Sequence, residues 1–258
     1  AMYPIKTLHI PILGDIGQGM LHDSPQSNAL FLPAMVYFSY QMLRMGIEDL
    51  LTLVDTGVVE NLNLLFSVGN HMRLDEHMPM KYQAQRTLDW LIYQLLIEKF
   101  KDDKRVSIVT EMSPFIFQNI RGHRYLFAHG NQVGYKNKPE KQAGAISNFI
   151  ATIRALFDSP VYRKKVGLTG ETFSRAVIGD IHVPVSFPRL LSNGSLNGQN
   201  ELGVNWGLEP IPAGQQLFGV STSHIQTWQY FLDCTEVQRE NPNSYAIFAN
   251  QFDKEFGR

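Results

Sequence analysis

The sequence predicts an α/β fold in which two packed, largely mixed sheets carry helices on their outer faces. Two observations support this class. Short apolar runs of strand length alternate with longer stretches whose apolar residues recur at helical spacing. Several of the apolar runs also stop at a glycine that polar side chains follow. Open α/β sheets place their ligand sites at such strand ends, so the same pattern predicts where a site lies.

Helices are predicted where apolar residues recur every three or four positions over more than ten residues. This pattern covers Leu32 to about Val54, about Met80 to Phe100, and Lys141–Phe157. Strands are predicted at the shorter apolar runs, which are Leu8–Leu13, Leu64–Val68, Val106–Val109, Phe115–Ile120, Tyr125–Phe127, Phe173–Ile178, Phe218–Ser221 and Ile225–Leu232. Asn193-Gly194 and Asn197-Gly198 are typical of hairpin turns.

Composition narrows the classes of function. The chain has 258 residues, of which 44% are hydrophobic and 18% charged, as in ordinary globular proteins. Its formal net charge of -1 excludes a global basic field for nucleic acid, although a local basic patch in the middle third stays open. The single cysteine, Cys234, excludes a disulfide framework and favours a cytosolic setting. No apolar run has the length of a membrane span, so no membrane partner is expected.

Four predicted strands end in residues that bind metals or transfer protons. These residues are Asp15, Asn70 with His71, His129, and Asp180 with His182. The blocks lie far apart in the sequence, whereas the ligands of a small structural zinc site come in close pairs. We therefore expect a site that several strand-loop units assemble at one sheet edge. Oxygen and imidazole donors without thiolate favour Mn, Fe or Zn, and two such cations can clamp the oxygens of an in-line displacement at phosphorus.

In this order, the strand-end blocks resemble the motifs of the calcineurin-like metallophosphoesterases. The blocks are Gly14-Asp15, Gly69-Asn70-His71, His129 after an apolar strand, and Gly179-Asp180-Ile181-His182. The chain is most similar to the form found in tailed bacteriophages and prophages, in which an arginine closely follows Gly-Asn-His and the last block runs into Asn-Gly-Ser. Here those residues are Arg73 and Asn193-Gly194-Ser195, and the resemblance extends to about Ser221. It implies a four-layer sandwich of two mixed sheets flanked by helices, with residues 1–258 forming a single domain.

The resemblance also implies roles for the matched residues. Asp15 would bridge two divalent metal ions, Asn70 and His129 would bind the second ion, and His182 would bind the first. His71 would protonate the leaving oxygen while a metal-bridging hydroxide attacks phosphorus. An imidazole that titrates near neutrality suits that general-acid role.

Two departures from the family pattern bear on activity. The family's opening Asp-x-His block is absent, and the chain starts within ten residues of a strand, so we expect truncation at the N-terminus. Asp180 replaces the first histidine of Gly-His-x-His, which makes it either a metal ligand or a turn residue. Because Asp15 and His182 alone would hold the first ion, we expect about one bound metal and weak diester hydrolysis. Arg73 either binds phosphate oxygens or is a solvated loop arginine.

The expected function is metal-dependent hydrolysis of a phosphodiester such as nucleic acid. One alternative is a phosphomonoesterase acting on protein or nucleotide. Another is a non-catalytic binding or assembly module that keeps the phosphoesterase fold, and the oligomeric state is open. The remaining histidines match no motif and are expected to be structural or surface residues: His9, His22, His77, His123 and His224.

Overall fold

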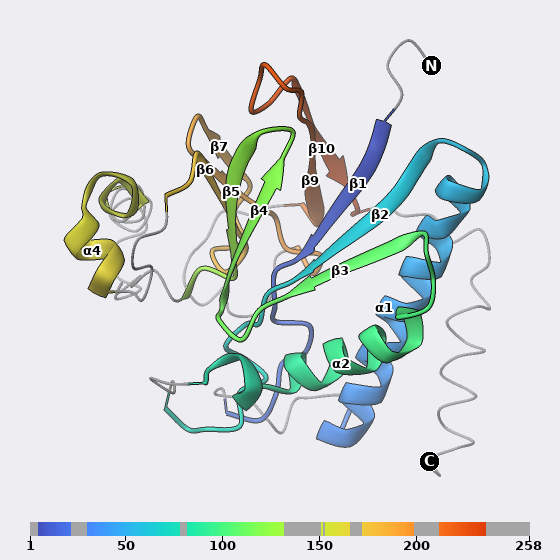
Figure 1. The fold of residues 1–258 in the computed structure, drawn as a ribbon. Coiled ribbons are helices and arrows are strands. Elements are labelled where there is room, and N and C mark those ends of the chain that lie inside the picture. Colours follow the sequence, from blue (N-terminus) through green and yellow to red (C-terminus); the bar gives the residue numbers. More distant parts are fainter. Residues whose placement is uncertain are drawn as a thin grey trace.

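The computed structural model describes residues 5–21, 30–77, 82–131, 151, 153–165, 172–198 and 212–235. These ranges contain both helices and strands, as the predicted α/β class requires (Figure 1). In chain order, the elements are β1 (Ile5–Ile12), α1 (Leu32–Asp55), β2 (Val59–Phe66), the short 3-10 helix η2 (Ala84–Arg86), α2 (Leu88–Phe100), β3 (Val106–Thr110), β4 (Phe115–Ile120), β5 (His123–Ala128), α4 (Pro160–Lys165), β6 (Arg175–Ile178), β7 (Val185–Phe187), β8 (Leu190–Ser192), β9 (Gly214–Gly219) and β10 (Trp228–Asp233).

These strands form three sheets. The first has the order β1-β2-β3 and is parallel throughout, with Ile10 opposite Leu64 and Leu64 opposite Ile108. Parallel neighbours need a crossover connection, and α1 and α2 supply one each. The second sheet has the order β4-β5-β6-β8-β7 and is mixed, because β5, β6 and β8 run parallel while β4 and β7 run antiparallel to their neighbours. The strands β9 and β10 form a separate antiparallel pair.

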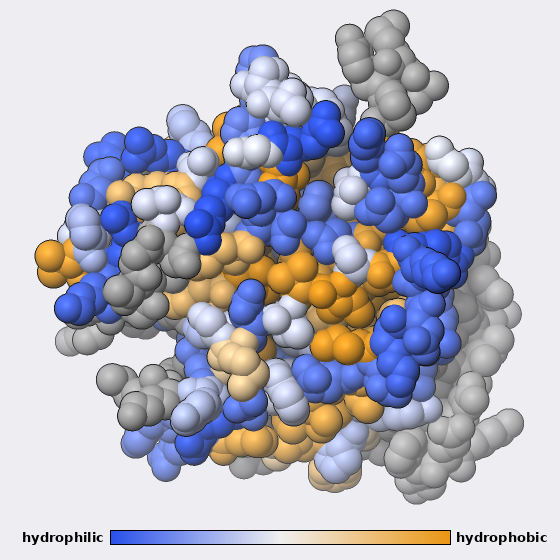
Figure 2. Space-filling view, in the orientation of Figure 1, coloured by the Kyte–Doolittle hydropathy of each residue, from blue (hydrophilic) through white to orange (hydrophobic). Residues whose placement is uncertain are grey.

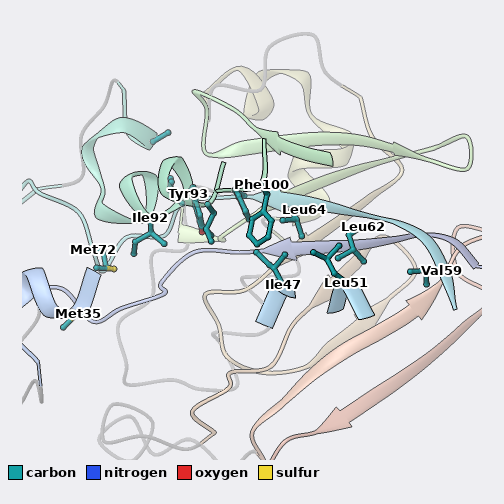
Figure 3. Close-up of a cluster of buried hydrophobic side chains, with 14 residues drawn as sticks. Met35, Ile47, Leu51, Val59, Leu62, Leu64, Met72, Ile92, Tyr93 and Phe100 are labelled. Carbon is teal, nitrogen blue, oxygen red and sulfur yellow. The ribbon is translucent and has the colours of Figure 1, made fainter. Parts of the chain in front are cut away.

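One face of the parallel sheet is covered by α1 and α2 (Figure 3). Side chains alternate along a strand, so Leu62 and Leu64 of β2 both point toward the helices, where they meet Ile47 of α1 and Phe100 of α2. The ring of Tyr93 in α2 stacks on Phe66, with 4.5 Å between ring centroids. This packing fixes α2 against the carboxyl end of β2.

The opposite face of the parallel sheet packs against the mixed sheet. Leu65 of β2, which is fully buried, joins Leu13 and contacts a cluster that includes Tyr125 and Phe127 of β5. The far face of the mixed sheet carries its own cluster, in which Leu156 packs under β5 and β6. The carboxyl ends of β1, β2, β5 and β6 therefore come close to one another between the two sheets. In the orientation of Figure 1, hydrophilic residues cover much of the surface and apolar residues gather across its middle (Figure 2).

The observed elements differ from the predicted ones in several places. β2 begins at Val59 rather than at Leu64, β9 spans Gly214–Gly219 rather than Phe218–Ser221, and β10 begins at Trp228 rather than at Ile225. The second helix begins at Leu88 rather than near Met80, because Thr87 is extended, bridges to Arg73 and caps the helix by accepting a hydrogen bond from the Trp90 N–H. Of the predicted helix Lys141–Phe157, residues 141–150 and 152 lie outside the described residues, whereas residues 153–158 are helical. The hairpin between β7 and β8 turns at residues 188–189 rather than at either Asn-Gly pair. In the part of the chain that the structure describes, no helix is long and apolar enough to cross a membrane.

Candidate metal centre

Two loops cross at the carboxyl ends of β1 and β2, and the crossing requires glycine in both. Gly14 has a φ of 84°, and a Cβ at this position would lie 2.2 Å from the Gly69 nitrogen. A Cβ on Gly69 would in turn lie 2.1 Å from Oδ1 of Asp15. Both distances are far inside van der Waals contact, so the two backbones approach as closely as they do only because neither residue has a side chain.

The crossing fixes the carboxylate of Asp15 on the backbone of the second loop. Its Oδ1 accepts hydrogen bonds from the N–H groups of Asn70 at 2.8 Å and His71 at 2.9 Å. Asp15 itself has a positive φ of 52°, which is uncommon outside glycine and is here held by these contacts. Its second oxygen, Oδ2, is directed toward the mixed sheet.

Three oxygen atoms that could bind a metal surround Nε2 of His129, itself a fourth potential ligand atom. This nitrogen lies 3.0 Å from Oδ2 of Asp15, 3.0 Å from Oδ1 of Asn70 and 3.2 Å from Oδ1 of Asp180. The ligand atoms of Asp15, His129 and Asp180 all lie within 4.8 Å of one another. The structure thus brings together residues from four strand ends, as the sequence predicts.

The tautomer of His129 suits a metal ligand. Its Nδ1 lies 2.6 Å from the carbonyl oxygen of Leu13, which can only accept a hydrogen bond, so Nδ1 carries the proton. Nε2 of this 2% exposed ring then faces three oxygen atoms. If Nε2 were unprotonated, its lone pair would face the lone pairs of these oxygens and repel them, so a cation or a proton is required between them. Histidine ligands of metals commonly donate the other ring N–H to a carbonyl in this way.

The charges in the site favour the binding of a cation. Burial alone would lower the pKa of His129, but the charges and hydrogen bonds of Asp15 and Asp180 outweigh it and raise the pKa well above its usual value. Burial would likewise raise the pKa of Asp15, yet attraction to His129 and His71 holds it far below the usual value. Without a metal, the cluster therefore holds a proton on His129 and a negative charge on Asp15. A divalent ion would take the place of that proton.

His71 lies at the edge of the cluster. Its Nε2 is 3.7 Å from Oδ2 of Asp15, and its Nδ1 is 3.2 Å from Oε1 of Gln18 in the loop after β1. Burial is the main effect that lowers the pKa of His71, and the positive charges of His129 and His182 act in the same direction against the attraction of Asp15 and Asp180.

In the last sequence block, Gly179-Asp180-Ile181-His182, Asp180 lies inside the cluster of potential ligands and His182 lies outside it. Asp180 points its carboxylate at His129, which favours the ligand over the turn-residue alternative. His182 has a φ of 58°, and its N–H donates to the carbonyl of Gly179 at 3.3 Å. Among the described residues, the group of close ligand atoms does not include His182. Its role as a ligand of a first metal stays a prediction.

Arg73 braces the loop that carries Asn70. Its guanidinium donates to the carbonyl oxygens of Asn70 at 2.7 Å and Glu76 at 3.0 Å. The half-buried side chain is therefore not a freely solvated loop arginine. Binding of phosphate oxygens by Arg73 stays a prediction.

Asp89 is a residue of the site that the sequence analysis missed. It lies in the first turn of α2, is fully buried, and accepts hydrogen bonds through Oδ2 from the N–H groups of Gly69 at 2.7 Å and Asp15 at 3.2 Å. Burial, followed by repulsion from Asp15, raises the pKa of Asp89 to about 6. The sequence held a signal, because Asp89 occupies the same helical stripe as the buried Ile92 and Leu96. An acidic residue in a first turn is so common that the signal is easily passed over.

Comparison with known proteins adds no assignment. No family model matches the sequence, and no curated protein matches it.

Proposed function

We propose that this chain is a metal-dependent phosphoester hydrolase of the calcineurin-like metallophosphoesterase type, acting on a phosphodiester such as nucleic acid. The observation that carries the proposal is the convergence of Asp15, Asn70, His129 and Asp180 on one point from four separate strand ends. The packing of the parallel sheet against the mixed sheet, with helices outside, supports the four-layer sandwich of that family.

The residues present fit a divalent cation. Two carboxylates, an amide oxygen and an imidazole nitrogen form a donor set without sulfur, which suits Mn, Fe or Zn. When bound, such an ion supplies Lewis-acid stabilisation of charge on a phosphoryl oxygen. Asp15 and Asp180 bring negative charge to the cation, while the hydrogen bond from Nδ1 of His129 to Leu13 keeps Nε2 directed at it.

His71 is the proton donor in this proposal. Its position beside the cluster, with Gln18 on Nδ1, leaves Nε2 toward the space next to Asp15. Once protonated, His71 would give the Nε2 proton to the leaving oxygen while a hydroxide oxygen bonds to phosphorus and the bond from phosphorus to the leaving oxygen breaks. Its lowered pKa makes the imidazolium a stronger acid than an exposed histidine.

One observation favours a second candidate, a non-catalytic binding module. The close ligand group accounts for one cation, and His182 lies outside it. A two-metal clamp on phosphate needs ligands for both ions. A chain that holds a single ion would bind a phosphoester better than it cleaves one.

The test combines metal content with hydrolysis of a generic aryl phosphodiester and the matching monoester. In the Mn²⁺-loaded protein, His71→Ala should lower diester turnover by about 10²–10⁴ and leave bound metal unchanged. His129→Ala should remove the metal as well. His224→Ala, in an exposed loop where the ring bonds to Ser223, is the matched control and should change neither.

The outcomes separate the candidates. Preference for the monoester would indicate a phosphomonoesterase. Bound metal without hydrolysis of either ester would support the binding module. Loss of metal in His71→Ala would make His71 a ligand and contradict its assigned role, and a wild-type protein that binds no divalent metal would overturn the proposal.

A further inference from the structure

Helix α2 directs two buried polar side chains at the loops that carry the metal ligands. Oδ2 of Asp89 accepts the N–H groups of Gly69 and Asp15, one from each loop. One helical turn later, the hydroxyl of Tyr93 donates to the carbonyl of Ser67 at 2.8 Å, at the end of the strand that leads into the Gly69 loop. The two side chains lie on the same helix face because residues four apart are neighbours on an α-helix.

Neither side chain has the surroundings of an ordinary helix residue. Both are fully buried, and Oδ1 of Asp89 is buried without a hydrogen-bond partner in the described part of the chain. Burying a carboxylate is costly, and the nearby negative charge of Asp15 adds repulsion. A favourable interaction with the start of α2 needs no burial, since acidic residues in a first turn have it at the surface. Asp89 differs from an ordinary acidic residue in a first turn because it accepts hydrogen bonds from two N–H groups at the loop crossing.

The hydrogen bonds connect α2 to the ligands in two steps. Asp89 holds the backbone of Gly69 and Asp15, and Asp15 holds the backbone of Asn70 and His71 through Oδ1. The separation of the two loops therefore sets where Oδ2 of Asp15 stands relative to Oδ1 of Asn70. Both of these atoms face Nε2 of His129.

We infer that Asp89, together with Tyr93, is the positioning pair of the metal centre. The pair fixes the crossing of the two loops and so holds Asp15 and Asn70 at the spacing that a divalent cation needs. This inference rests on the metal centre of the proposed function but not on hydrolysis. A protein that binds metal without cleaving esters would leave it standing.

The test measures Mn²⁺ affinity by calorimetry, alongside urea unfolding in EDTA. Asp89→Leu removes the acceptor while keeping the same branched arrangement of heavy atoms and should weaken Mn²⁺ binding about 10–100-fold, as loss of a residue that orients metal ligands commonly does. Asp89→Asn keeps an oxygen that can accept both N–H groups and should stay within about threefold of the wild type. Asp49→Leu, the same substitution at an exposed position of α1, is the control and should leave Mn²⁺ affinity unchanged.

Tyr93→Phe covers the case in which Asp89→Leu does not fold. It removes only the hydroxyl, keeps the ring stacked on Phe66, and should weaken Mn²⁺ binding several-fold. Unchanged Mn²⁺ affinity in Tyr93→Phe, or in a folded Asp89→Leu, would overturn the inference even if the unfolding free energy in EDTA fell, because that result marks a purely structural role. A wild-type protein without Mn²⁺ affinity would overturn both the inference and the metal centre.

Discussion

Replacing Gly69 by alanine tests the loop crossing most directly. The new Cβ would lie 2.1 Å from Oδ1 and 2.3 Å from the backbone nitrogen of Asp15, whereas ordinary contact begins near about 3.5 Å. Neither atom belongs to the free end of a flexible side chain. Oδ1 is held by the N–H groups of Asn70 and His71, and the nitrogen donates to Asp89. The loops must therefore separate by more than one ångström.

The size of the effect follows from what that separation breaks. Overpacking of a tight site costs about 1–3 kcal/mol. Loss of a hydrogen bond to a charged group costs about 1.5–3 kcal/mol, and the separation breaks at least one of the two hydrogen bonds that Asp15 Oδ1 accepts across the crossing. We expect Gly69→Ala to lower the free energy of unfolding in EDTA by about 2.5–6 kcal/mol, the sum of these two costs. Because Asp15 and Asn70 move apart, Mn²⁺ affinity should fall by about 100-fold.

The chain provides a matched control for this substitution. Gly46 lies exposed within α1, and no atom stands within 4 Å of the position where its Cβ would be. Gly46→Ala should raise the free energy of unfolding by about 1 kcal/mol through helix propensity and leave Mn²⁺ affinity unchanged. Urea unfolding and calorimetric titration of both variants decide the matter. If Gly69→Ala behaved like Gly46→Ala in both measurements, the loops would not cross as described.

Two further predictions concern the charges of the cluster. In EDTA, the raised pKa of His129 in the folded state stabilises the protein fully below pH 6.5, and this contribution is lost as the pH rises through the folded pKa. The lowered pKa of Asp15 acts in the opposite direction: its contribution is present above pH 3.8 and is lost as the pH falls through its folded pKa. Urea unfolding across pH should therefore show the pair's full contribution from about pH 4 to pH 6.5, and His129→Gln should remove the decline on the alkaline side. Asp180→Asn should weaken Mn²⁺ affinity more than His182→Ala does, because Asp180 faces Nε2 of His129. The reverse order in calorimetry would place His182, not Asp180, at the cation.

The strands and helices around the site were predictable because they depend on local patterns. The helix that starts at Leu32 shows its period over more than twenty residues, and its observed end at Asp55 is one residue from the predicted one. The strand before Gly69 was recognisable from its apolar run and its abrupt end. The start of α2 was not, because Thr87 is kept extended by its bridge to Arg73, a contact between segments that hydrophobic period does not report.

The proposed metal ligands could be predicted from local patterns in the sequence, whereas Asp89 could not. Asp15, Asn70 and His129 each come within four residues of the end of a strand, so the rule that strand ends meet at a sheet edge was enough to group them. Asp89 follows a polar loop instead, at a place where an acidic residue normally improves a helix start. Only the crossing of the Gly14 and Gly69 loops above α2 turns that carboxylate inward. The crossing is tertiary, so no local pattern in the sequence announces it.

The two oxygens of Asp15 explain why position 15 requires a carboxylate rather than an amide. Oδ1 accepts two backbone N–H groups, which occupies both of its acceptor positions, while Oδ2 faces Nε2 of His129. An asparagine could satisfy only one of these sides. If its NH₂ group took the place of Oδ1, it would face the two backbone N–H donors and could not accept from them. If the NH₂ group took the place of Oδ2, it would direct its two protons at the proposed cation site. The same carboxylate therefore closes the loop crossing and offers an oxygen to the proposed metal site, which ties folding of the crossing to the geometry of that site.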